Sequence, residues 1–122
     1  MVLFYKLHHS GTKRGSSLSA VIRVSFSLAS ATSEELSQLA TYLTRQLRKA
    51  GVSTLLLPDV AKRSQESQFL RNDEMGVPYT AVLNDNTLKT GILGLRSRET
   101  TLKEQVHVSE LESHVGLLLR NY

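Results

Sequence analysis

Residues 22–28 alternate between apolar and polar side chains, which is the pattern of a β-strand with one buried face. Apolar residues occupy positions 22, 24, 26 and 28, and Arg23, Ser25 and Ser27 stand between them. Short apolar runs bounded by glycine, proline or polar residues predict four more strands. These strands are expected at residues 52–57, 77–83, 91–98 and 102–108.

Apolar residues at helical spacing follow the first strand, from Leu36 to Ala50. Thr32 and Glu35 have the spacing of a capping box at the start of this helix, and Gly51 is placed to end it in a left-handed conformation. A strand, a helix and a second strand in this order predict a right-handed crossover and a parallel pair of strands.

Two further helices are predicted, over residues 62–75 and from Ser109 onward, where the serine has the position of an N-cap. Phe69 and Leu70 are the main apolar residues of the first of these two helices. Asn84 begins a sequence that is typical of a turn. Together the elements predict a three-layer α/β fold, in which three helices pack on a five-stranded mixed sheet.

The composition excludes several kinds of site. The 122 residues include no cysteine, so disulfides, thiolate-bound metals and a cysteine nucleophile are ruled out. The four histidines lack the spacing of metal ligands, and no serine lies in a nucleophile elbow. No apolar run approaches the roughly 20 residues that span a bilayer. We therefore predict a domain that is not an enzyme and uses no metal, cofactor or membrane segment.

The formal net charge of +4 favours anionic partners such as nucleic acids. The charge is unevenly placed, because no acidic residue precedes Glu34 while lysine, arginine and serine are frequent there. This composition fits a mitochondrial transit peptide, but a solvated N-terminal arm is the simpler interpretation. We expect residues 1–19 to form this arm and residues 20–122 to form the domain.

The predicted hairpin of residues 91–108 carries a cluster of basic side chains. Arg96 and Arg98 are two residues apart in a strand, so they project from the same face. A two-residue turn at Thr100 and Thr101 would place Arg98 opposite Lys103, and such a pair of like charges is relieved by an anion or an acidic partner. Two alternatives remain open. A distant acidic residue neutralises the arginines, or a register shift of one residue moves Lys103 to the other face.

Glycines at positions 91 and 94 lie at the start of the fourth predicted strand. A glycine in a strand marks a bulge or the close approach of another backbone, so this strand edge is a candidate contact with a partner chain. The alternative is that Gly91 simply ends the preceding turn.

The run LRSRETTLKE at residues 95–104 carries a family resemblance, and His107, Ser109 and Leu111 continue it. With the element order β-α-β-α-β-β-β-α, the chain resembles the anticodon-binding domain of class IIa aminoacyl-tRNA synthetases. Within that superfamily it is most similar to the C-terminal domain of accessory subunits of the mitochondrial DNA polymerase gamma. The first half of the chain matches only in element order and apolar pattern.

This resemblance implies a mitochondrial, non-catalytic accessory domain that binds the catalytic subunit of the DNA polymerase, supports DNA binding and raises processivity. It makes Arg96, Arg98 and Lys103 candidate residues for binding the partner or the nucleic acid, with Gly91 and Leu93 as interface positions. The alternative is a synthetase domain that recognises an RNA loop with the same sheet. Three phenylalanines and four tyrosines offer few surfaces on which bases could stack, which disfavours that alternative. The oligomeric state is left open.

Overall fold

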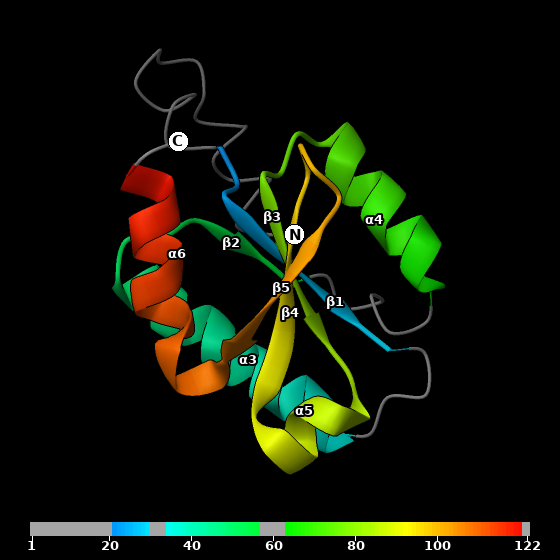
Figure 1. Ribbon diagram of the computed structural model, residues 1–122, viewed down its shortest axis with the longest axis vertical. Coiled ribbons are helices and arrows are strands. Elements are labelled where there is room, and N and C mark those ends of the chain that lie inside the picture. The colour runs from blue at the N-terminus through cyan, green and yellow to red at the C-terminus, as the bar shows by residue number, and fades with distance from the viewer. Residues whose placement is uncertain (1–20, 30–33, 57–62, 121–122) are drawn as a thin grey trace.

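Strands and helices alternate in the first part of the chain, and a hairpin and a closing helix complete it (Figure 1). The computed structural model describes residues 21–29, 34–56 and 63–120. The predicted arm of residues 1–19 and the capping residue Thr32 lie outside the described residues. The elements are β1 (Val24–Leu28), α3 (Glu34–Lys49), β2 (Thr54–Leu55), α4 (Gln65–Glu74), β3 (Tyr79–Leu83), α5 (Asp85–Thr90), β4 (Ile92–Ser97), β5 (Lys103–His107), the 3₁₀ turn η3 (Val108–Glu110) and α6 (Leu111–Arg120).

The five strands form one mixed sheet in the order β2-β1-β3-β4-β5. β1 pairs in parallel with both β2 and β3, and the β3–β4 and β4–β5 pairs are antiparallel. The predicted five-stranded mixed sheet and the parallel pair around the first helix are therefore confirmed. β2 is only two residues long, so it covers just the beginning of β1.

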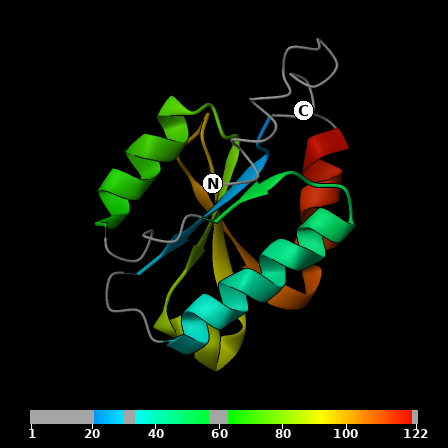
Figure 2. The same cartoon turned by 180° about the vertical axis from the view of Figure 1, so that it is seen from behind.

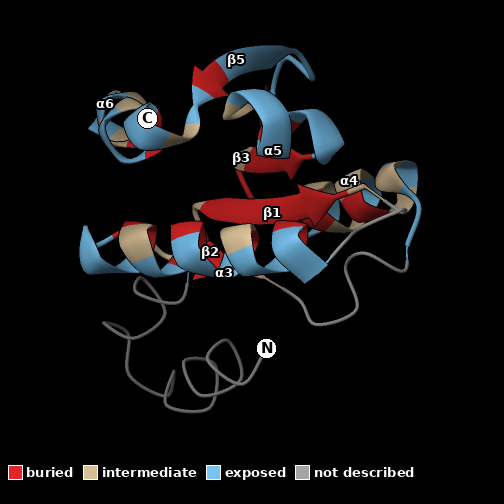
Figure 3. Cartoon of the chain, turned by 90° about the horizontal axis from the view of Figure 1, so that it is seen from below, coloured by how far each residue is buried: buried red, intermediate tan, exposed pale blue. Residues whose placement is uncertain are grey.

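The hydrophobic core lies on the face of the sheet that packs against α3 and α6. Val24, Phe26 and Leu28 of β1 are buried there, as the alternating pattern predicts. Figure 2 shows α3 and α6 on the same side of the strands, and Figure 3 shows the exposed outer side of α3 facing away from β1. α3 ends where Gly51 adopts a φ of 87°, which confirms the predicted glycine stop.

The opposite face of β1 is also buried, contrary to the prediction of one exposed face, because α4 covers it. Ser25 and Ser27 donate hydrogen bonds from their hydroxyl groups to Asn72 and Gln68 of α4. Serines at these positions suggested an exposed face. Because their hydroxyl groups are hydrogen-bonded inside the protein, their burial is tolerated.

Phe69 and Leu70, the apolar residues that were expected to hold α4 against the sheet, are not the buried residues of this helix. Leu70 is 60% exposed and Phe69 is only half-buried, whereas the buried residues of this helix are Gln68 and Asn72. The Gln68 side chain donates to the Leu28 carbonyl and accepts from the Leu28 amide, both at 3.0 Å. Because β2 is too short to reach this part of β1, the glutamine amide takes the place of a neighbouring strand.

Two local predictions also need correction. The segment expected to be a turn forms the short helix α5, because Asn84 and Thr87 make a reciprocal capping box. The described part of the chain thus contains four α-helices where three were expected. Ser109 was expected to cap the last helix. Instead, His107 caps the turn η3 that leads into α6, and its Nδ1 accepts a hydrogen bond from the Ser109 amide at 3.1 Å.

Candidate partner and nucleic-acid interface

The hairpin between β4 and β5 has a four-residue loop, not the predicted two-residue turn. The Ser97 amide donates to the Leu102 carbonyl at 3.0 Å, which closes the strand pair, and the Thr101 amide donates to the Ser97 carbonyl at 2.8 Å. Thr101 has a φ of 61°, a conformation that a four-residue loop of this kind imposes on its last residue. The observed register of β4 and β5 therefore differs from the predicted one by two residues.

This shift places Lys103 opposite Arg96 and leaves Arg98 in the loop. Since side chains alternate with a period of two, a shift of two residues keeps the predicted face intact. Arg96, Lys103, Gln105 and His107 do share one face of the sheet, as expected.

Arg96 is engaged inside the domain. It is 9% exposed, its guanidinium donates to both carboxylate oxygens of Asp73 at 3.1 and 3.3 Å, and its Cζ lies 4.6 Å from the centre of the Phe69 ring. The alternative in which a distant acidic residue neutralises an arginine is thus correct for this position. Arg96 therefore links β4 to α4.

Arg98 lies at the surface, in the hairpin loop. Its Nε donates to the Asp73 carbonyl at 3.1 Å, near the C-terminal end of α4, where a cation is favourable. Its backbone amide donates to the Pro78 carbonyl at 2.9 Å, which fixes the start of the loop. The exposed guanidinium is therefore held in place and still faces solvent.

Lys103 is exposed like Arg98, but its side chain has no partner among the described residues. Within residues 21–29, 34–56 and 63–120 it makes no hydrogen bond or ion pair. Its aliphatic stem crosses the sheet over Gly94, where an added Cβ would lie 3.2 Å from the Lys103 Cδ. The glycine thus makes room for the stem, and the ammonium group is available to an anion.

Gly91 and Leu93 have structural roles that account for their positions. Gly91 is the left-handed C-cap of α5, with a φ of 77°, and an added Cβ would lie 2.5 Å from the His107 Nε2. This confirms that Gly91 ends the preceding element. Leu93 is 2% exposed and its side chain belongs to the core.

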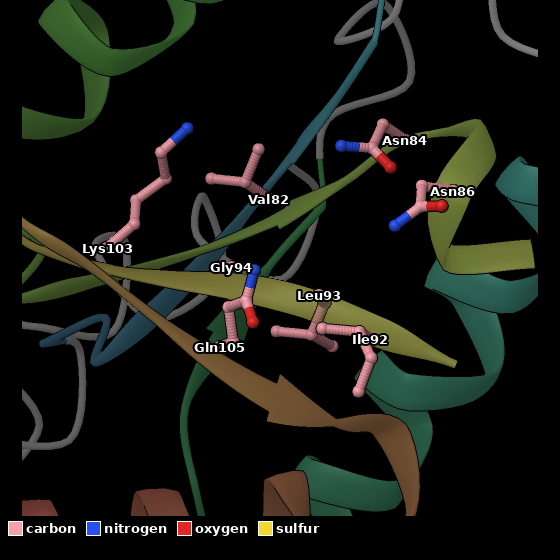
Figure 4. Close-up of a pocket in the computed structure, with 8 residues that line it drawn as sticks. All are labelled: Val82, Asn84, Asn86, Ile92, Leu93, Gly94, Lys103 and Gln105. Atoms are coloured by element: carbon pink, nitrogen blue, oxygen red, sulfur yellow. The ribbon is translucent and has the colours of Figure 1, made fainter. Parts of the chain in front are cut away.

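A groove of about 210 Å³ runs beside Lys103, on the face of the sheet that α4 leaves open. Figure 4 shows Lys103 and Gln105 on one side of the groove and Asn84 and Asn86 on the other. The remaining lining residues are Val82, Ile92, Leu93 and Gly94. Side-chain amides and one cation can bind carboxylate, phosphate or amide groups, but the lining holds no nucleophile paired with a base.

The sequence analysis did not identify this groove, although the register provides a signal for it. Val82, Gly94 and Gln105 lie side by side on three adjacent strands. The glycine between two larger residues leaves a hollow in the sheet face. Asn84 and Asn86 reach its rim because α5 begins where β3 ends.

The described residues hold no group of three histidine, aspartate or glutamate side chains that could bind a metal ion. Among the described helices, none has the length and apolar character needed to cross a membrane.

Comparison of the chain with known proteins assigns it to a family. The model of the anticodon binding domain matches residues 19–116. The chain is 32% identical to the mitochondrial DNA polymerase subunit gamma-2 of Drosophila melanogaster over 73% of its own length and 26% of that protein. It is 34% identical to the Xenopus laevis subunit, over 76% of the chain and 20% of the relative. The chain therefore spans about a fifth to a quarter of these relatives.

The chain is also similar to aminoacyl-tRNA synthetases. A glycine–tRNA ligase of Thermococcus gammatolerans is 30% identical over 70% of the chain and 15% of the ligase. The structure of a prolyl-tRNA synthetase from Cryptosporidium parvum matches with a TM-score of 0.76 at 20% identity, over 84% of this chain and 21% of the synthetase, which supports the fold. With its mixed sheet, its helices on both faces and the match over residues 19–116, the chain belongs to the anticodon-binding-domain family.

Proposed function

We propose that the chain is a non-catalytic accessory domain of a mitochondrial DNA polymerase, which binds the catalytic subunit and supports DNA binding and processivity. The observation that carries this proposal is the similarity to DNA polymerase subunit gamma-2 proteins at 30–34% identity over about three quarters of the chain. Such a domain works through a surface, and the open groove beside Lys103 is a surface of suitable chemistry. A location in mitochondria follows from the same proposal.

In this proposal Lys103 and Arg98 supply the positive charge that meets a phosphate group or an acidic partner. Both are exposed and both extend from the same hairpin. Arg96 contributes by holding α4 in place, and Gly91 and Leu93 contribute by setting the position of β4. That these residues act together in binding is part of the proposal.

A second candidate function is the anticodon-binding domain of a synthetase, which the similarity to glycine–tRNA ligases favours. The amide groups of Asn84, Asn86 and Gln105 could hydrogen-bond to the edges of bases. Single-stranded RNA is usually held by stacking on aromatic side chains, and no aromatic residue lines the groove. The comparisons support both functions, and on the composition of the groove we propose the polymerase function first.

A paired binding experiment separates the two functions. The chain is immobilised and offered the catalytic subunit of the mitochondrial DNA polymerase from the same organism, and in parallel a pool of tRNA. Retention of the catalytic subunit without tRNA is the expected result. Retention of tRNA without the catalytic subunit would assign the synthetase function instead. Lys103→Glu should weaken the retention, whereas Lys49→Glu on α3, which packs on the other face of the sheet, should leave it unchanged.

A further inference from the structure

β5 is an edge strand, and its register shows which of its backbone groups point away from β4. The Ser97–Leu102 pair closes the hairpin with a hydrogen bond, and the Val108 amide donates to the Gly91 carbonyl at 2.8 Å at the far end. In an antiparallel pair, hydrogen-bonded and non-hydrogen-bonded positions alternate between such points. Three residues of β5 therefore direct both their N–H and C=O groups away from β4: Lys103, Gln105 and His107.

In the part of the chain that the structure describes, this edge lacks most of the features that usually prevent pairing with another chain. β5 has five residues, contains no proline and pairs with β4 in an uninterrupted register, so no bulge bends it away. The other edge, β2, has only two residues. A lysine on an edge strand discourages pairing with a second basic strand, but it favours a strand that carries an acidic residue.

The side chains around the edge define the chemistry of a matching strand. Leu102, directly before β5, is 71% exposed, and Lys103 next to it is free of partners in the described structure. Adjacent residues in a strand point to opposite faces, so the two lie on different sides of the edge. Glu104 lies on the face opposite to Lys103, where its Oε1 is hydrogen-bonded to Nε2 of His114 in α6 at 3.0 Å.

We infer that β5 receives an extended segment of the polymerase catalytic subunit, which adds a sixth strand to the sheet. This segment carries an acidic residue that meets Lys103 and an adjacent apolar residue that covers Leu102. The inference rests on the proposed function, since it specifies how the accessory domain binds its partner.

Substitutions at Gln105 test the inference, because this residue is exposed and its N–H points outward. Gln105→Pro removes that N–H and places a ring at the edge, while Gln105→Ala removes only the side chain. For the intact chain titrated with the catalytic subunit, we expect the proline variant to bind at least about tenfold more weakly than the alanine variant, which measures separately what the groove-lining side chain contributes. Urea unfolding of both variants verifies that each is folded.

Equal affinities of the two folded variants would overturn the inference while leaving the proposed function in place. A parent chain that fails to bind the catalytic subunit would refute the proposed function and the inference with it. Self-association of the chain that Gln105→Pro abolishes would assign the edge to a second copy, and would also overturn the inference.

Amide hydrogen exchange provides an independent measurement. In the free chain, the amides of Glu104 and Val106 should exchange slowly because they are bonded to β4. The amides of Lys103, Gln105 and His107 should exchange fast and become protected when the catalytic subunit binds. Unchanged exchange at these three amides in the complex would contradict strand addition.

Discussion

Arg96 and Asp73 join β4 to the end of α4 through two parallel hydrogen bonds, from Nη1 to Oδ1 at 3.1 Å and from Nη2 to Oδ2 at 3.3 Å. The guanidinium also lies over the Phe69 ring, so one side chain links the sheet, the helix and an aromatic residue. The family resemblance made both Arg96 and Arg98 candidate binding residues. The structure assigns the two arginines different tasks.

Arg96→Ala should lower the free energy of unfolding by about 1.5–3 kcal/mol, because it leaves a half-buried carboxylate without its partner. Arg98→Ala should cost less than about 1 kcal/mol, since its guanidinium is exposed and makes one bond to a backbone carbonyl. Urea unfolding of the two single variants measures the difference. Equal losses would mean that the ion pair contributes nothing beyond a surface contact.

Gln68→Ala should be among the most destabilising single replacements in α4. The variant leaves the amide and carbonyl of Leu28 and the hydroxyl of Ser27 without their partner inside the protein. We expect a loss of about 2–4 kcal/mol, measured by chemical denaturation. Gln38→Ala, at an exposed position of α3, serves as the matched control and should change stability by less than about 0.5 kcal/mol.

Gly91→Ala should destabilise the chain more than Gly51→Ala does. Both glycines have a positive φ, which costs an alanine about 1–2 kcal/mol, but only at Gly91 does the new methyl group meet another side chain, the His107 ring. The excess should disappear in a His107→Ala background, where the two alanine replacements should agree within about 0.5 kcal/mol. Persistence of the excess in that background would show that the contact is not its cause.

Lys103→Ala should weaken DNA binding to a similar extent for different DNA sequences, because a lysine that meets a phosphate carries no sequence information. The slope of log affinity against log salt concentration should fall by about 1 in magnitude, as one released counterion is lost. Lys49→Ala should leave the slope unchanged. A slope that does not change in the Lys103 variant would place this side chain outside the DNA contact.

The apolar pattern of the sequence predicted the five strands and the helices α3 and α6, because burial of one face dominates where an element sits. The register of the hairpin could not be predicted in this way. A loop of two residues or of four leaves Lys103 on the same face, so the apolar pattern is satisfied equally by both. Only the hydrogen bonds of Ser97 distinguish them.

The burial of α4 could not be predicted for a different reason. Gln68 and Asn72 have the composition of an exposed helix face, and their partners Ser25 and Ser27 lie more than 40 residues earlier in the chain. A polar pair of this kind leaves no periodic signal in either segment. The groove was missed for a related reason, since its hollow depends on which residues flank Gly94 across two strands.

The polar contacts between α4 and the sheet have a consequence for how the domain unfolds. A helix held mainly by amide, hydroxyl and ionic contacts exposes little apolar surface when it separates from the sheet. Its detachment should therefore depend only weakly on denaturant, while loss of α3 or α6 would expose the whole core and depend on it steeply. We therefore expect α4 to unfold as a separate cooperative unit, which leaves one face of the sheet bare while the rest of the domain stays folded.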